Sequence, residues 1–156
     1  FVAAAAALGM KAELVSAEVG QASAIKMFRS IMIKGLEALM LESMLAASEY
    51  RVEDRVLASL KETYPALDWQ KLSGYMIERV VSHGRRRAAE MREVAQTLEG
   101  IGLEPIMAAA TAARQQWLAD LGAKERLGGR KTEDRAELIR LIREAMGKAN
   151  VPSASD

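Results

Sequence analysis

The sequence predicts an all-α protein, a helical bundle arranged around one long helix. Three observations support this prediction. Apolar residues recur at helical spacing almost throughout the chain from Gly20 onward. Residues 21–50 contain no proline, and only one short stretch, near the amino terminus, alternates as a strand would. At 156 residues the chain is about the length of one domain and is long enough to bury a core.

The longest predicted helix covers residues 21–50. At 1.5 Å per residue it would be about 45 Å long, well above the usual helix of a globular protein. Five of its apolar residues define one line along the helix, namely Ile25, Phe28, Met32, Leu36 and Leu39. Three others depart from that line: Ile31, Leu41 and Leu45. An apolar surface this wide needs more than one layer of covering helices.

Shorter helices are predicted downstream from their start and stop signals. Asp68 is a plausible N-cap, Pro105 stands at a first helical position, and Thr132 is a plausible cap for the last helix. A helix also ends at Tyr64-Pro65, because the residue before a proline avoids the helical conformation. The predicted ranges are 52–63, 69–82, 85–98, 106–121 and 132–146. Residues 122–131 read as a glycine-punctuated loop.

The first 19 residues differ from the rest of the chain. Residues 1–8 read as the end of a helix that stops at Gly9, and residues 10–16 alternate weakly, as a short strand does. A single strand has no partner within this sequence. We therefore expect 1–19 to be the end of an otherwise absent domain, 20–150 to form the all-α domain, and 151–156 to be a disordered tail.

Composition excludes several classes of function. The sequence has no cysteine and a single histidine, His83, so thiolate chemistry, disulfides and multi-histidine metal sites are excluded, and no metal site is expected. The net charge of +1 gives no overall basic excess that would attract nucleic acid or a membrane surface. No stretch approaches the apolar length of a membrane span. We expect a cytoplasmic protein that binds neither nucleic acid nor membranes.

The most specific pattern is GQASAIKMFRSIMIKG, residues 20–35, at the start of the long helix. Lys26 and Lys34 lie eight residues apart with Ser30 midway, so the three side chains fan across roughly 80° of one helix face. By spacing alone they are either a solvated stripe or the lining of a site. The chain has no G-x-G-x-x-G, no P-loop and no H-E-x-x-H, so it lacks the usual means of gripping a nucleotide.

This stretch resembles the domain junction of the β-hydroxyacid dehydrogenase and 6-phosphogluconate dehydrogenase superfamily. There, a G-x-G-x-x-x-K-x-x-(N/H)-N motif joins a Rossmann domain to a long interdomain helix. Gly20 matches the first glycine, Ala22 replaces the second, and Lys26 falls at the catalytic lysine. Arg29 and Ser30 occupy the two positions where asparagine or histidine is common.

A second segment is similar to one branch of that superfamily, whose members carry an uncharacterised all-α C-terminal domain. The branch pattern R-x-x-x-H-x-x-R-R-A-x-E-M is formed here by Arg79, His83, Arg86, Arg87, Ala88, Glu90 and Met91. The resemblance covers roughly residues 7–121 and leaves the last helix outside it. It also accounts for the first 19 residues, which would be the last helix and strand of a Rossmann domain.

The resemblance implies the substrate-binding and dimerisation domain of an NAD- or NADP-dependent oxidoreductase. Such an enzyme transfers hydride between the nicotinamide and a small anionic hydroxy or keto acid, and Lys26 would be the general acid/base. The cofactor would be bound mainly by the absent domain, with Gly20 and Ala22 approaching it. This chain alone is therefore expected to be inactive, and in the enzyme it would form a homodimer with an interface of more than about 1,000 Å².

The resemblance also implies which side chains meet the substrate: Ser30, Lys34, Arg29, His83 and Arg86. Decarboxylating members place a glutamate and a tyrosine seven and eight residues after the lysine, and these positions are Ile33 and Lys34 here. We therefore expect simple dehydrogenation or reduction, without decarboxylation.

Several alternatives remain open at the level of sequence. Lys26 and Lys34 could be solvated surface lysines, and Ser30 could hydrogen-bond back to its own helix. The arginines of HGRRR could form salt bridges with Glu78, Glu90 and Glu93 and bind no ligand anion. The whole chain could be a non-catalytic helical interaction module, or an imine-reducing relative on the same scaffold.

Overall fold

The structure is a computed structural model that describes residues 2–9 and 19–149. Within these residues all regular secondary structure is helical and no strand occurs, which confirms the all-α prediction. The strand predicted over 10–16 and the tail 151–156 lie outside the described residues. The first helix, α1, spans Val2–Ala7, and Gly9 follows it with a φ of 72°.

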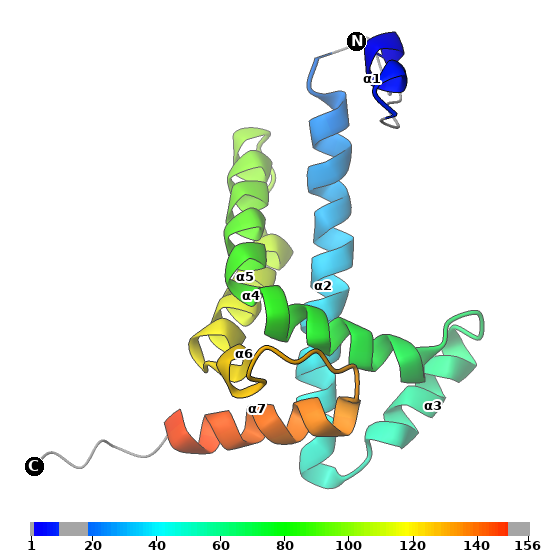
Figure 1. Ribbon diagram of the computed structural model, residues 1–156, viewed down its shortest axis with the longest axis vertical. Helices are drawn as coiled ribbons and strands as arrows, with labels where there is room; N and C mark the ends of the chain where they lie inside the picture. Colours follow the sequence, from blue (N-terminus) through cyan, green and yellow to red (C-terminus); the bar gives the residue numbers. More distant parts are fainter. Residues whose placement is uncertain (1, 10–18, 150–156) are drawn as a thin grey trace, which may run out of the picture.

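The long helix α2 spans Gln21–Tyr50, 30 residues, as predicted. It begins after Gly20, whose φ of 99° suits glycine, and no side chain caps this end. At its other end Arg51 takes a left-handed conformation, and its backbone N–H donates to the carbonyls of Ala47 and Ser48. Figure 1 shows α2 running nearly the full height of the molecule, with the second half of α4 beside its upper part and the first half of α4, α3 and α7 around its lower part.

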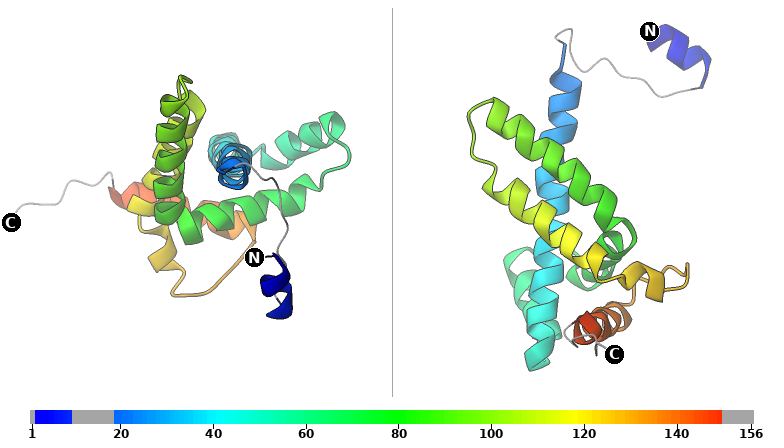
Figure 2. Two further views of the ribbon diagram at one scale, coloured as in Figure 1. Left: turned by 90° about the horizontal axis from the view of Figure 1, so that it is seen from above. Right: turned by 90° about the vertical axis from the view of Figure 1, so that its left-hand side faces the viewer.

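Five further helices follow α2 along the described chain: α3 (Glu53–Thr63), α4 (Trp69–Gly100), α5 (Ile106–Asp120), α6 (Ala123–Arg126) and α7 (Arg135–Ala149). The predicted N-cap Asp68 is confirmed, because its carboxylate accepts a hydrogen bond from the Lys71 backbone N–H at 3.1 Å. The second half of α4 and α5 form an antiparallel hairpin that packs against α2 (Figure 2).

The predicted break between helices over 69–82 and 85–98 is wrong, because α4 is one helix of 32 residues. The ribbon bends near the middle of α4, so its first half crosses α2 and its second half runs beside α2 (Figures 1 and 2). Gly84 lies in this middle part, and a Cβ there would be 2.7 Å from the Gln115 carbonyl oxygen. The glycine permits close packing of α4 on α5 and does not end a helix.

Two further boundaries differ from the prediction. The glycine-punctuated loop contains the short helix α6, and α7 begins at Arg135 rather than at 132. The Asp134 carboxylate accepts a hydrogen bond from the Glu137 N–H at 3.1 Å, so Asp134 is the cap. The Thr132 hydroxyl accepts a hydrogen bond from the Asp134 N–H at 3.1 Å, just before α7 begins.

The main core lies around the lower half of α2. It joins residues of α2, α3, α4, α5 and α7, and its fully buried members include Leu41, Met44, Ile77 and Ile142. A smaller core lies between the second half of α4 and α5, and on α2 only Met27 and Ile31 pack against it. Among the described residues, the first third of α2 is therefore covered mainly where Met27 packs.

The predicted apolar line of α2 faces away from both cores. Its five residues are 38–63% exposed: Ile25, Phe28, Met32, Leu36 and Leu39. The three residues that depart from that line, Ile31, Leu41 and Leu45, all pack into the bundle. At about 100° per residue the outward line and the bundle-facing line are on opposite sides of the helix.

Candidate functional site

The candidate site lies where the first half of α2 faces the second half of α4. Three contacts fix an antiparallel register: Thr97 Oγ1 to Met27 Sδ at 3.7 Å, Lys34 to Glu90, and Glu37 to Arg87. In each pair the residue numbers add to the same total, so the register does not slip along the helices. This register sets the distances between the predicted site residues.

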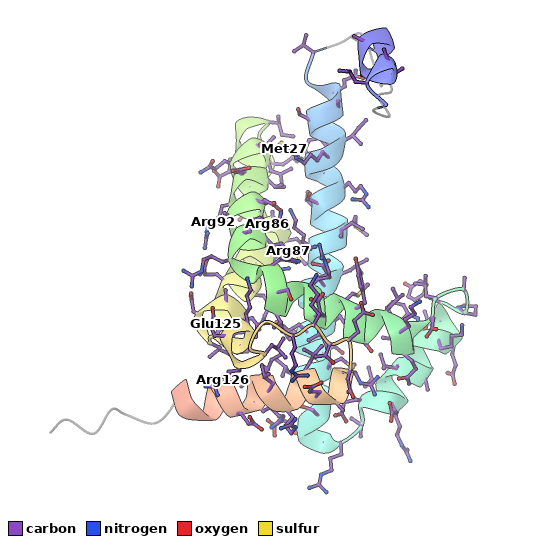
Figure 3. All side chains as sticks on the ribbon, viewed as in Figure 1. Met27, Arg86, Arg87, Arg92, Glu125 and Arg126 are labelled. Carbon is purple, nitrogen blue, oxygen red and sulfur yellow. The ribbon has the colours of Figure 1, made fainter. Side chains whose placement is uncertain are left out.

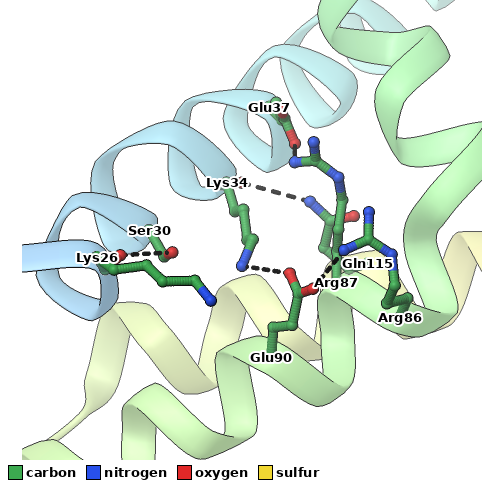
Figure 4. Close-up of polar contacts among 8 residues, drawn as sticks. All are labelled: Lys26, Ser30, Lys34, Glu37, Arg86, Arg87, Glu90 and Gln115. Atoms are coloured by element: carbon green, nitrogen blue, oxygen red, sulfur yellow. Dashed lines mark hydrogen bonds and ion pairs between the residues drawn. The ribbon is translucent and has the colours of Figure 1, made fainter. Parts of the chain in front are cut away.

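Lys34 and Glu90 form the best-defined ion pair of the site, with Lys34 Nζ 2.7 Å from Glu90 Oε2 (Figure 4). Arg86 donates to the other oxygen of the same carboxylate. Burial alone would raise the pKa of Glu90, but the Lys34 ammonium and the Arg86 guanidinium together hold this pKa below its usual value. The Lys34 side chain is only 10% exposed, so the alternative that it is a solvated lysine is wrong.

One turn further along α2, Glu37 pairs with Arg87 in the interior (Figure 4). Their side chains are 2% and 8% exposed. Burial raises the pKa of Glu37, and the nearby guanidiniums of Arg87 and Arg79 oppose this rise. A buried pair of this kind is costly to break, because either partner left alone is an uncompensated charge.

Polar atoms beside this pair are left without partners. In the part of the chain that the structure describes, Arg79 Nε, Arg87 Nε and Gln115 Oε1 are buried and have no hydrogen-bond partner. The Gln115 amide group lies 3.5 Å from the Lys34 carbonyl oxygen, at the outer limit of a hydrogen bond. The interface between α2, α4 and α5 is thus charged and incompletely satisfied.

Lys26 is exposed near the free end of α2, on the same side as Lys34. Among the described residues its amino group has no hydrogen-bond or ion-pair partner. Ser30 donates its hydroxyl hydrogen bond to the Lys26 carbonyl at 2.9 Å, as its local alternative predicts. Arg29 is also exposed, and so are Gly20 and Ala22, the two residues predicted to approach a cofactor.

His83 lies in the middle of α4 and is partly buried. His83 lies one turn before Arg87 on α4, and Arg87 is level with Glu37, eleven residues along α2 from Lys26. His83 is therefore more than about 16 Å from Lys26 along the axis of α2. The structure therefore brings Lys34 and Arg86 together on Glu90 but separates His83 from Lys26. A substrate of a few carbon atoms does not span that distance.

The arginines of the HGRRR segment are paired, and only one predicted partner is among the acids they contact. Arg86 pairs with Glu90, Arg87 pairs with Glu37, and Arg85 lies 3.9 Å from Asp120. Sequence reasoning missed Glu37 as a buried partner. The only signal for it was its position one turn beyond Lys34 on the same face of α2.

Other kinds of site find no support in the described residues. Residues 2–9 and 19–149 contain no group of three or more His, Cys, Asp or Glu side chains placed to hold a metal ion. In the same part of the chain no helix has the length and apolar character needed to cross a membrane.

Comparisons with known proteins agree with the helical domain and name no activity. Residues 47–118 match a family model described as "Domain of unknown function (DUF1932)". An "Uncharacterized 28.5 kDa protein in 7S RNA 5'region" of Methanothermus fervidus is 34% identical over 102 residues, which are 64% of this chain and 39% of that protein.

A solved structure is similar over most of the chain. It is the crystal structure of a conserved hypothetical protein from Sinorhizobium meliloti 1021, with a TM-score of 0.76 and 38% sequence identity over 90% of this chain and 46% of that one. The chain thus spans less than half the length of either relative. The predicted resemblance is confirmed as far as this helical domain.

Proposed function

We propose that this chain is the all-α, substrate-side domain of an NAD(P)-dependent oxidoreductase of the β-hydroxyacid dehydrogenase type, with Lys26 as general acid/base. One observation carries the proposal. Along the bundle-facing side of α2, Lys34 and Glu37 are each paired with a residue of α4, whereas Lys26 is exposed and unpaired among the described residues. A free amine at the uncovered end of a long helix suits a group that acts on something bound from outside the chain.

The lengths of the relatives support this assignment. More than half of each similar protein lies outside the match, which leaves room for a nucleotide-binding domain in those proteins. The family-model match begins at residue 47, downstream of Lys26, so it supports the helical domain and carries no information about the lysine.

The described residues do not fit a whole dinucleotide. They offer no glycine-rich loop between a strand and a helix, and at the start of α2 only Gly20, Ala22 and Lys26 are placed to approach one. We therefore assign binding of the cofactor to protein outside this chain. When bound there, the nicotinamide supplies the hydride acceptor or donor, and this chain supplies the proton.

The proposed role of Lys26 is to hold that proton. In oxidation, the neutral Nζ accepts the hydroxyl proton of the substrate while a carbonyl forms at the carbon that loses hydride; in reduction the proton returns to the oxygen. A lysine does this near pH 7 only when its pKa is lowered by burial or by neighbouring positive charge. Lys34 contributes little to that field because Glu90 neutralises it. The covering protein must therefore desolvate Lys26.

The test is to assay the full-length protein for oxidation of NADH and NADPH with a panel of small keto acids. The proposal predicts turnover with at least one anionic keto acid and cofactor binding that requires protein upstream of this chain. The second candidate is a non-catalytic helical interaction module, which the exposed apolar line on α2 also suits. That candidate predicts a full-length protein that binds neither cofactor and turns over no substrate.

A further inference from the structure

We propose that the bend of α4 forms a binding site for a small phosphate-bearing solute, together with α6 and the loop that precedes α7. The site lies at His83, one turn beyond the Glu37–Arg87 pair and so more than about 16 Å along α2 from Lys26. It therefore does not rest on the oxidoreductase proposal, and either can fail without the other.

Two adjoining cavities open at this bend. The larger, of about 550 Å³, is lined by α4 and α6 and includes His83, Arg86 and Lys124. The smaller, of about 320 Å³, shares His83 and Lys124 with it and extends to Arg130 and Lys131. Figure 3 labels Arg86 beside the second half of α4 and Glu125 below it, beside α6. The volumes of the two cavities are typical of small-molecule sites in proteins.

Positive charge dominates the walls of these cavities. Five cationic side chains line them, Arg85, Arg86, Lys124, Arg130 and Lys131, against the single carboxylate of Glu125. Arg86 and Arg130 have carboxylate partners outside the cavities, Glu90 and Glu137. Among the described residues the amino groups of Lys124 and Lys131 have no ion-pair partner. Arg85 lies 3.9 Å from Asp120, so the unpaired cations of the cavities are Lys124 and Lys131. Glu125, which lines both cavities, offsets one of these two charges.

His83 reports this field from the wall that both cavities share. Its pKa is lowered first by burial and then by the charges of Arg79, Arg86 and Arg87, while Glu78 acts weakly in the opposite sense. The Glu78 carboxylate already accepts the Ser82 hydroxyl at 2.5 Å. A dianion seated against His83 would offset the positive charge and accept a hydrogen bond from the imidazole.

The chemistry of the walls favours a phosphate group over a single carboxylate. A phosphate dianion presents three acceptor oxygens and about two charges, so one such group can accept hydrogen bonds from the unpaired ammonium groups of Lys124 and Lys131 at once. The remaining walls include Val81, Ala89 and Ala119, which leave apolar room for a short carbon chain next to the anion. A free phosphate ion and a small phosphomonoester share this chemistry.

His83 is the only histidine of the chain, so its ring proton signals in an NMR spectrum need no assignment. We would titrate the 156-residue chain with inorganic phosphate and, separately, with methyl phosphate, at ionic strength held constant with chloride. The proposal predicts a saturable shift of the His83 signals and a rise of the His83 pKa in the bound state. Tighter binding of methyl phosphate would indicate a phosphomonoester, and tighter binding of inorganic phosphate the free ion.

Two variants separate a built site from general charge attraction. Lys124→Gln combined with Lys131→Gln should weaken phosphate binding at least about tenfold. Lys71→Gln removes the same kind of charge from an exposed position in the first turn of α4 and should leave binding unchanged. Circular dichroism checks that each variant is folded. A shift that does not saturate, that chloride alone reproduces, or that the double variant retains would overturn the proposal.

Discussion

In the first part of α2, over residues 21–39, the two sides of the helix differ in the opposite sense from a typical amphipathic helix. The side that faces the bundle carries Lys34 and Glu37, whereas the side that faces away carries Phe28, Met32 and Leu36. In an ordinary surface helix the apolar stripe faces the core and the charged residues face water. Here charge lies inside because α4 supplies a partner for each charged group. Further along, the bundle-facing side is apolar, with Leu41 and Met44 fully buried in the main core.

The comparison shows that the inner side needs charged partners, whereas the outer side needs an apolar surface to cover it. On the inner side, Glu90 pairs with Lys34 and Arg87 pairs with Glu37. These ion pairs offset the free-energy cost of burying the charged groups of α2. The outer side has no complement among the described residues, and contiguous apolar surface of this kind usually marks an interface. We propose that a second copy of the protein covers it.

The largest expected effect comes from the inner side. Glu37→Ala should lower the free energy of unfolding by about 3–5 kcal/mol, because Arg87 is then a buried charge without a partner. Urea denaturation followed by circular dichroism measures the loss. Replacing both partners with methionine should cost less than Glu37→Ala alone.

The matched control is Glu42→Ala, which breaks the more exposed pair of Glu42 with Arg114. It should cost less than about 1 kcal/mol. Equal losses for Glu37→Ala and Glu42→Ala would show that the inner pair is not desolvated, and the contrast between the two sides of α2 would disappear.

Charges on the outer side should act on assembly and leave folding intact. Met32→Glu combined with Leu36→Glu should weaken the proposed homodimer by at least about a hundredfold, because two charges per subunit would be buried at its centre. Sedimentation velocity at micromolar protein measures the change, with Leu103→Glu, in the turn between α4 and α5, as the control on another exposed apolar residue. A wild-type chain that sediments as a monomer would contradict a helix-mediated dimer.

Glu90 offers a smaller effect with a defined pH dependence. Because its pKa is lower in the folded protein than in the unfolded chain, its ionised form stabilises the fold above the unfolded pKa. That stability is lost as the pH falls through the folded pKa. Because the Glu90 side chain is 35% exposed, solvent screens these pairs, and Glu90→Gln should cost less than about 1 kcal/mol at pH 7. The cost should become progressively smaller below about pH 4.5. A difference from wild type that stays constant down to pH 3 would exclude this role.

The smallest expected effect is on substrate affinity. In the full-length enzyme, Lys34→Ala should raise the apparent KM for the anionic substrate severalfold with little change in kcat. Glu90→Gln is the companion variant, because it keeps Lys34 and frees its ammonium. A KM that rises equally in both variants would mean that Lys34 acts by supporting the α2–α4 contact and does not meet the substrate.

The helix bounds followed from local signals that the sequence states directly. Asp68 caps α4 and Pro65 follows the end of α3, because capping groups and proline act on their own neighbours. The middle of α4 was not predictable in the same way. In a sequence, a glycine within a helical stretch suggests that the helix ends there. The structure shows instead that α5 passes so close to Gly84 that a side chain at this position would clash.

The residues of the candidate site could be predicted from the sequence, but which of them lie close together could not. The motif singled out Lys26, Lys34 and Arg86, and the structure joins the last two on Glu90. The distance between Lys26 and His83 depends on the register of two helices, which no local pattern specifies. The burial of Glu37 was hidden for a related reason, because its partner Arg87 lies on another helix and no local pattern brings the two side chains together.

The most direct test of the account is single-turnover hydride transfer in the full-length protein with Lys26→Met. The account predicts a rate at least about a hundredfold lower than wild type, as expected for loss of a general acid/base, with cofactor affinity unchanged. Lys71→Met, an exposed lysine of α4, should keep the wild-type rate. A Lys26→Met protein that transfers hydride at the wild-type rate would contradict the account.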